Sequence, residues 1–481
     1  MLSSSKKIWF LTLSFLFIAL NCYFIAKERF EFLAIPAILL IAYLAIFKMD
    51  SLVKLIIFLV PLSVSLNELE ISQAGQIDMA LPTEPILFGL MIIFIIKLFQ
   101  QGSFDKKIIY HPVTITILIN LMWIGFTCIP SVRPLVSIKF LLSRIWLLAT
   151  FYFIMTQLFK DKKNMTSFFW LYIIGFTIVI VRTLIMHSFN GFDQKSANWI
   201  MSPFFNDHTS YGACIAFILP FIVSKLFDKE IFGTVKVLIL LLFIFFIVAL
   251  VLSYTRAAWV SVIGALGVYL ILKLKIKWWF ITTIILFVGV FVIGMWSQIS
   301  IALESNKQDS STDLKEHVSS ISNVSSDASN LERFNRWNSA IEMFKKKPFF
   351  GWGPGVYAFE YAPFQKSYDK TIISTNAGDG GNAHSEYLGP LSESGILGFL
   401  SMLSIIVATI FTGVKVYKRS INPKHRTMAL IALLGLVSYY LHGILNNFLD
   451  TDKISSLFWG MTAIIVVLDV YFLPLEQKEK A

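Results

Sequence analysis

The chain has 481 residues, of which 56% are hydrophobic and only 15% are charged, and it contains 45 phenylalanines. A water-soluble fold cannot bury so large an apolar fraction, so these numbers exclude an ordinary soluble protein and indicate that the bilayer is its solvent. The formal net charge of +11 would suit a nucleic-acid partner, but the distribution of the basic residues along the chain gives them another role.

Apolar segments long enough to cross about 30 Å of hydrocarbon recur along the chain. The first ends without a small-residue cleavage site, so we expect a retained helix and not a signal peptide. The third and fourth segments are short, and re-entrant or interfacial placement is the alternative for both. The fourteen candidate spans lie at residues 8–26, 31–47, 52–66, 84–99, 112–129, 137–158, 166–187, 208–226, 234–253, 257–273, 278–297, 388–414, 426–447 and 454–473. The sequence therefore predicts an all-α polytopic membrane protein with about 12–14 transmembrane helices.

Lysine and arginine gather in alternate connections between these spans, for example at 160–163, 225–236 and 415–426, whereas 65–84 contains neither residue. This is the positive-inside bias, so the basic excess orients the protein in a membrane and requires no nucleic acid. We expect a multi-pass protein of the bacterial inner membrane, in contact with membrane lipid, with both termini in the cytoplasm.

Three parts follow from this topology. Residues 1–297 are predicted to form a transmembrane helix bundle, and residues 298–387 a long, partly helical periplasmic loop that carries part of an active site. Residues 388–481 are predicted to supply the C-terminal transmembrane helices and a short cytoplasmic tail. Chemistry that needs water and charge is therefore expected in the periplasmic loop and on the connections that face it.

The sequence has no signature of a cofactor or metal site. The three cysteines, Cys22, Cys128 and Cys214, have no mutual spacing typical of a disulfide framework or a metal site. No Walker loop, dinucleotide fingerprint or Asp-x-Asp element is present, which argues against a soluble nucleotide donor. We therefore expect neither cofactor nor metal.

The loop begins with a serine-rich stretch at 304–330 that is typical of coil. Ser329 and Glu332 then stand at capping-box spacing, and Pro348 follows a run of lysines, which predicts a helix of about four turns. The Gly/Pro-rich stretch at 349–359 lacks the context of a dinucleotide fingerprint. It is predicted to form a tight turn that docks the loop on the membrane surface.

Arg256 lies in Ser-Tyr-Thr-Arg-Ala-Ala-Trp, between the ninth and tenth spans, on the side away from the basic connections. One reading makes it an interfacial anchor for lipid headgroups. The other pairs it with Arg333 or Arg336, which share one helix face with Trp337, as a fork-shaped clamp for a diphosphate.

His384 stands in a glycine-led polar stretch directly before the twelfth span. It either caps the next helix or acts as a general base, for which an imidazole is suited near neutral pH, with Glu386 close enough to influence it. Ser385 lacks the surroundings of a nucleophile and is expected to cap the helix.

Asp207 and His208 stand where the eighth span begins, and they either cap it or line the site. Arg182 and Arg144 lie within predicted spans, where a charge is costly, so each is expected to have an anionic partner in the protein or in a ligand. Arg133 and Lys139 are further cations on the same side.

Three stretches, SYTRAAW at 253–259, ERFNRWNSAIEMFKKKPFFGWGPGVYAF at 332–359 and AHSEYLGPLSESGILGF at 383–399, resemble the bacterial O-antigen ligase superfamily in their order and spacing. The likeness is specific over about 207–400, while the N-terminal third matches in hydropathy and topology alone. Two departures are the count of fourteen spans against about twelve, and Ser385 in place of the family's usual asparagine.

The resemblance implies an inverting, metal-independent glycosyltransferase that takes a finished glycan from undecaprenyl diphosphate on the periplasmic face. It implies that Arg256 and Arg333 hold the lipid diphosphate, with Arg333 matching the family's loop arginine better than Arg336. It further implies that His384 accepts a proton from the acceptor hydroxyl or orients it. The predicted catalytic residues are thus His384, Arg256 and Arg333, and the predicted substrate-binding residues are Arg336, His208, Asp207, Glu386 and Arg182.

Four functions remain open from the sequence. The leading one is a ligase that joins the glycan of the lipid-linked donor to lipid A core. The alternatives are an O-antigen or exopolysaccharide polymerase, whose acceptor is another lipid-linked glycan, and a protein O-glycosyltransferase. A non-enzymatic transporter of lipid-linked glycans is disfavoured, because no internal repeat with broken helices is evident.

Overall fold

The computed structural model describes residues 4–27, 34–66, 68, 79–277, 328–366, 374 and 380–480. Most of these residues are helical. The strands among them are β1 (Val64–Ser65) and β2 (Ala80–Leu81), two residues each, which pair antiparallel with Val64 opposite Leu81. The predicted class, an all-α polytopic membrane protein, is confirmed. The chain divides into two compact units, residues 1–56 and residues 57–481.

The first unit contains α1 (Ser4–Ile25) and α2 (Ala34–Phe47), and α3 (Met49–Leu59) begins in it. Large apolar side chains on α1 and α2 are exposed, including Phe15 and Ile46. Such exposure would be unfavourable in water and suits a lipid environment.

The second unit contains the remaining elements. In chain order these are η2 (Val60–Leu62), β1, β2, α4 (Thr83–Gln101), α5 (Lys106–Ile109), α6 (Pro112–Thr127), α7 (Pro134–Leu148), the π-helical turn η3 (Ala149–Ile154), α8 (Met155–Leu158), α9 (Lys162–Phe189), α10 (Gln194–Ala197), α11 (His208–Leu226), α12 (Gly233–Leu252), α13 (Arg256–Lys273), α17 (Ala328–Lys346), α18 (Tyr357–Glu360), η4 (Ala362–Phe364), α19 (Leu388–Arg419), α20 (Pro423–His442), α21 (Asp452–Val467), the π-helical turn η5 (Leu468–Phe472) and α22 (Leu473–Lys480).

Within the described residues, eight helices are long and apolar enough to cross a membrane. They are Thr83–Gln101, Pro134–Leu158, Lys162–Phe189, His208–Leu226, Gly233–Leu252, Arg256–Lys273, Leu388–Arg419 and Asp452–Gln477. The weak fourth segment, 84–99, is thus a full-length helix, α4. The weak third segment, 52–66, is not, because α3 ends at Leu59 and the chain continues through η2 into β1. The predicted span at 278–297 lies outside the described residues.

Helix starts follow local chemistry. Proline occupies the first position of α6, α7 and α20, where its missing N–H costs no hydrogen bond. Side-chain oxygens of Asp161, Asp207 and Asn422 accept free amide protons at the starts of α9, α11 and α20. These signals fix where each helix begins, and therefore which residues stand at the membrane surface.

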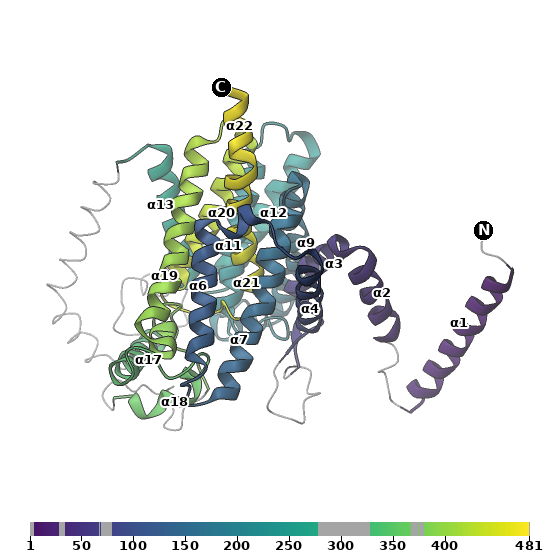
Figure 1. Cartoon of the computed structure of the whole chain (residues 1–481), viewed down its shortest axis with the longest axis horizontal. Helices are drawn as coiled ribbons and strands as arrows, with labels where there is room; N and C mark the ends of the chain where they lie inside the picture. The colour runs from purple at the N-terminus through teal and green to yellow at the C-terminus, as the bar shows by residue number, and fades with distance from the viewer. Residues whose placement is uncertain are drawn as a thin grey trace. The chain divides into compact units, whose positions relative to one another are not determined.

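Helix α20 is central in the second unit and packs against α11, α13, α19 and α21, while α19 also runs beside α6 (Figure 1). Helix α21 is almost entirely buried, with large side chains such as Trp459 in the core. We call the end at which α11 and α13 begin and α20 ends the site end. Helices α17 and α18 contact α19 there, at the lower end of the bundle in Figure 1.

The turn around 348–356 docks on a break in α19. At the break, Gly395 has a φ of 70° and a ψ of −168°, and the N–H of Ile396 donates to the carbonyl of Pro348 (2.9 Å). The N–H of Gly353 donates to the carbonyl of Glu393 (2.8 Å), and a Cβ on Gly353 would lie 2.0 Å from Ser131 Oγ. The predicted tight turn is therefore present, and it is fitted against α19 and the α6–α7 connection. Docking of this turn on the membrane surface stays a prediction.

The helix predicted after Ser329 is also present as α17, and it is described from Ala328. Glu332 lies inside this helix, and its Oε1 accepts a hydrogen bond from Arg336 Nε (3.0 Å). The expected capping box with Ser329 stays a prediction. A small core of Ala340, Met343, Tyr357, Tyr361 and Ala383 packs under α17.

Candidate functional site

The starts of α11 and α13 meet at the site end. Thr255 Oγ1, directly before α13, donates to the carbonyl of His208 (2.7 Å). The approach is close because Gly212 has no side chain: a Cβ there would lie 2.8 Å from Thr255 Cβ. This contact places Arg256, the first residue of α13, beside Asp207 and His208.

Asp207 caps α11. Its Oδ1 accepts from the amides of Thr209 (2.7 Å) and Ser210 (2.9 Å), and from Thr209 Oγ1 (2.6 Å). Asp207 thus caps α11, which was one of its two predicted roles. A contact with substrate stays a prediction for both Asp207 and His208.

Arg333 extends from α17 toward the same place. Its Nε donates to the carbonyl of Leu445 (3.2 Å), in the connection between α20 and α21. Burial lowers the pKa of Arg333 from its ordinary value, and the negative charge of Asp207 opposes that shift. The positive charges of Arg333 and Arg256 are near enough to repel each other. Two guanidinium groups from separate helices are therefore held close together, an arrangement that an anion between them would stabilise.

His384 is held on the helix that carries Arg333. Trp337 Nε1, one turn after Arg333, donates to the carbonyl of His384 (3.2 Å), and the amide of His384 donates to Asn382 Oδ1 (3.0 Å). His384 has a φ of 50°, which is uncommon for a residue with a side chain and persists only where the surroundings enforce it. The backbone of His384 is thus fixed next to Arg333, while its catalytic role stays a prediction.

The two residues after His384 anchor this segment. Ser385 Oγ accepts from the amides of Tyr387 (3.3 Å) and Leu388 (3.4 Å), so it caps α19 as expected. Glu386 Oε1 accepts from the amides of Phe448 and Leu449 (both 2.8 Å) and from the hydroxyl of Tyr439. Burial, and then the charge of Asp450, raise the pKa of Glu386 to about 7. Glu386 thus ties the His384 segment to the α20–α21 connection.

Arg336 supports the same segment from the opposite side. It is 4% exposed, and its guanidinium bonds Glu332 and the carbonyl of Asn382 (3.1 Å) while lying over the ring of Tyr361. Gly381 allows this approach, since a Cβ there would lie 1.9 Å from Arg336 Nη1. These contacts hold the loop in place, and a role for Arg336 in substrate binding stays a prediction.

The arginines of the predicted spans differ in their partners. Arg144 Nη2 pairs with Asp450 Oδ1 (2.5 Å), which confirms the anionic partner that its burial required. Arg182 instead donates to the carbonyls of Ile200 (3.3 Å) and Ser202 (2.5 Å) and lies over the ring of Phe204. Arg133, at the start of α7, pairs with Glu360 (2.7 Å) and links α7 to α18.

The sequence did not single out residues 443–450, the connection between α20 and α21, which joins these parts. Its carbonyls accept from Glu386, Arg333 and Asn382, at Gly443 (2.8 Å), Leu445 (3.2 Å) and Asn447 (3.3 Å). The signal that could have found it is His442, an ionisable residue inside an apolar segment.

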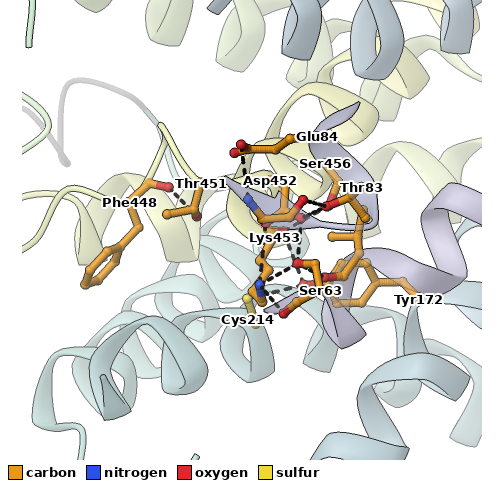
Figure 2. Close-up of polar contacts among 12 residues, drawn as sticks. Ser63, Thr83, Glu84, Tyr172, Cys214, Phe448, Thr451, Asp452, Lys453 and Ser456 are labelled. Carbon is orange, nitrogen blue, oxygen red and sulfur yellow. Dashed lines mark hydrogen bonds and ion pairs between the residues drawn. The ribbon is translucent and has the colours of Figure 1, made fainter. Parts of the chain in front are cut away.

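A second buried polar cluster lies at the start of α21 (Figure 2). Asp452 Oδ2 accepts from the hydroxyls of Ser63 (2.7 Å) and Thr83 (2.6 Å), and Lys453 Nζ donates to Ser63 Oγ (2.6 Å). Tyr172 donates to the carbonyl of Lys453 (3.2 Å). Because its charges are paired with each other and with hydroxyl groups, this cluster ties η2 and α4 to α21.

The described residues contain no group of three or more His, Cys, Asp or Glu side chains that could hold a metal ion. The same residues show Cys22, Cys128 and Cys214 as free thiols.

Comparison with known proteins gives a match over the part of the chain that carries most of the site. Residues 240–403 match the family model described as O-Antigen ligase. The chain is also 24% identical over 231 residues to an uncharacterized protein of Haemophilus influenzae, across 47% of this chain and 53% of that relative. The chain thus spans about half the length of the curated relative it matches.

The matched region begins within α12 and ends within α19, so it includes Arg256, Arg333 and His384. The matched family model is described as that of a ligase, and the long apolar helices indicate a multi-pass membrane protein. The resemblance drawn from three short stretches is confirmed over residues 240–403, where the chain is similar to the family described as O-Antigen ligase.

Proposed function

We propose that this protein transfers a glycan from undecaprenyl diphosphate to a periplasmic acceptor hydroxyl, with lipid A core as the leading acceptor, by an inverting reaction that needs no metal. One observation carries the proposal. Arg256 and Arg333 come from different helices and lie within range of each other's charge, while Trp337 holds His384 one turn away from Arg333.

The donor side of the reaction needs stabilised negative charge. As the bond between the anomeric carbon and the diphosphate breaks, the electron pair leaves with the diphosphate oxygen. Two guanidinium groups can each make paired hydrogen bonds to phosphate oxygens, which an ammonium group cannot do. Binding the diphosphate would also remove the repulsion between Arg256 and Arg333, so part of the binding energy comes from preorganised charge.

The acceptor side needs a base. In the proposed step the acceptor oxygen attacks the anomeric carbon from the face opposite the diphosphate, and its proton moves to His384. A new glycosidic bond forms, the old bond to the diphosphate breaks, and the configuration at carbon inverts. A general base of this kind accounts for roughly 10²–10⁴-fold in rate.

The side of the membrane follows from charge. Basic residues that include Lys160, Lys225, Lys415 and Lys424 lie at the end of the bundle opposite the site, in helix ends and the connections between them. The positive-inside bias assigns that end to the cytoplasm, which supports a site facing the periplasm of a bacterial inner membrane, with both termini inside.

The proposal is tested with protein purified in detergent, a glycan linked to undecaprenyl diphosphate, and lipid A core. We expect glycan transfer and release of undecaprenyl diphosphate with EDTA present and no nucleotide added. A requirement for a divalent metal or for a nucleotide sugar would contradict the proposal.

The same assay identifies the acceptor. Growth of the lipid-linked glycan in the absence of lipid A core would indicate a polymerase, and transfer to an added periplasmic protein would indicate a protein O-glycosyltransferase. Transfer to lipid A core alone supports the ligase.

A further inference from the structure

His442 is the last residue of α20, and it is buried at the site end with only 1% of its surface exposed. Its ring stacks on Tyr439 (6.3 Å between centroids) and lies against Phe448 (6.2 Å). Its Nε2 lies 3.2 Å from the amide nitrogen of Asn446. Because that amide nitrogen can only donate, Nε2 is the acceptor and the proton of a neutral ring is on Nδ1.

Nδ1 of His442 is buried, and no described residue forms a hydrogen bond with it. The ring also faces the backbone of Ala257, next to Arg256, but the geometry there falls short of a hydrogen bond. Buried polar groups are almost always satisfied by protein, water or ligand. A missing partner alone does not identify a site, since His425 Nε2, at the other end of α20, also has none among the described residues.

The surroundings distinguish His442 from His425. His442 is near enough to Arg333, Asp207 and His208 for their charges to act on its ring. A short chain of contacts also joins His442 to Arg333, because the amide of Leu445 donates to the carbonyl of His442 (3.0 Å) and the carbonyl of Leu445 accepts from Arg333 (3.2 Å). By contrast, His425 pairs with Glu476 (2.5 Å).

We infer that His442 binds the diphosphate of the lipid-linked donor, donating a hydrogen bond from Nδ1 to a phosphate oxygen alongside Arg256 and Arg333. The inference rests on the proposed function and extends the diphosphate site to α20, outside the region matched by the family model. A neutral imidazole N–H adds direction without adding a third positive charge beside the two arginines. The hydrogen bond from His442 therefore sets the orientation of the diphosphate, while the two arginines supply most of the electrostatic attraction.

Two substitutions separate the ring nitrogens. The amide nitrogen of asparagine is as many bonds from the backbone as Nδ1 and can donate there, and the amide oxygen of glutamine is as many as Nε2 and can accept there. His442→Asn therefore keeps the proposed phosphate donor and loses the contact with Asn446, whereas His442→Gln does the reverse. If His442 only stabilised the fold through its contact with Asn446, His442→Asn would lower the stability of the protein more than His442→Gln does.

The experiment measures the affinity of detergent-purified protein for undecaprenyl diphosphate, together with the melting temperature of each variant. We expect His442→Gln to weaken binding about tenfold to a hundredfold, as for a lost hydrogen bond to a charged group, and His442→Asn to stay within about threefold of the parent. His425→Gln, on the same helix at the far end, is the matched control and should bind as the parent does.

His442→Phe covers the case in which His442→Gln does not fold, because it keeps an aromatic ring between Tyr439 and Phe448 and removes both nitrogens. It should show the same loss of affinity. Parental affinity in folded His442→Gln or His442→Phe, with Arg333→Ala weakened, overturns the role of His442 and leaves the proposed function intact. A parent that does not bind undecaprenyl diphosphate overturns both.

Discussion

The two ends of α20 use buried charge differently. At the end away from the site, Glu476 accepts from His425 (2.5 Å), Ser420 and the amide of Ile421, and Asp469 pairs with both Lys415 (2.7 Å) and His111 (3.2 Å). At the site end, Arg256 and Arg333 bring two like charges together, and Arg333 donates to a carbonyl. Opposite charges that pair with each other stabilise a fold. Like charges that the fold holds close together favour the binding of an anion.

Charge at the site end is not uniformly of this kind. The Asp452–Lys453 cluster in Figure 2 is paired within itself, and so is Arg144 with Asp450. The contrast is therefore between individual clusters of charged residues. Substitutions of the like-charged arginines should change turnover, and substitutions in the clusters of paired opposite charges should change stability.

The largest effect is expected from His384→Ala. Loss of the base should lower turnover by roughly 10²–10⁴-fold while leaving the affinity for the lipid donor close to parental. Ser385→Ala is the control, because it removes the adjacent helix cap and should cost about 1 kcal/mol of stability with turnover per folded molecule unchanged. If His384→Ala folds and transfers glycan at the parental rate, the catalytic role is wrong.

Arg256→Ala and Arg333→Ala come next. Each should weaken use of the lipid donor by about 10²–10³-fold, the usual effect of losing one preorganised donor to developing charge. The loss in donor use should exceed any loss of stability, since each substitution also removes repulsion from the other arginine. Lysine at either position should restore activity in part, because a point charge cannot make the paired contact. Full activity in the alanine variants would refute the diphosphate clamp.

Glu476→Ala tests the paired end of the comparison. Removing this carboxylate leaves His425, Ser420 and two backbone amides without their acceptor, which should destabilise the protein by about 3 kcal/mol. Thermal unfolding in detergent measures the change, and transfer per folded molecule should be parental. A drop in turnover without a drop in stability would break the distinction between the two ends.

The smallest effect concerns pH. The pKa of Glu386 is raised from 4.5 to about 7 by burial, so the folded state binds this proton more tightly than the unfolded state does. The protonated Glu386 side chain therefore adds about 1–3 kcal/mol to the free energy of unfolding. This stabilisation is fully present below about pH 4.5, declines as the pH rises toward 7 and is absent at higher pH. Melting temperatures between pH 5 and 8 should show the decline, and Glu386→Gln should flatten it. An unchanged slope in Glu386→Gln would assign the dependence to another group.

Local patterns predicted much of the fold. Hydropathy found the long helices, and proline and glycine signals placed the end of α17 and the docking turn, because these signals depend on neighbouring residues. The third segment failed because Pro61, within η2, and the pairing of β1 with β2 end the helix early. Contacts between distant segments, such as Glu386 with Phe448 and Leu449, leave no trace in composition or periodicity.

The candidate site was predictable only in part. Arg256, Arg333 and His384 were named from short motifs, and the structure brings together α13, α17 and the segment before α19, which carry them. The rule that a buried charge needs a partner predicted one for Arg144 and for Arg182, but it could not say that Arg182 bonds carbonyls. The α20–α21 connection went unnoticed because its backbone atoms make the contacts, and backbone atoms are the same in every sequence.

The break at Gly395 bears on how a lipid-linked substrate reaches the site. The turn at 348–356 completes the hydrogen bonding of α19, through Ile396 to Pro348 (2.9 Å), Trp352 to Ser392 (3.1 Å) and Gly353 to Glu393 (2.8 Å). Lifting this turn would leave several amides and carbonyls unpaired where the helix enters the membrane, at a few kcal/mol each. We therefore expect this turn to stay docked on α19 in each catalytic cycle and the substrate to enter past another part of the protein.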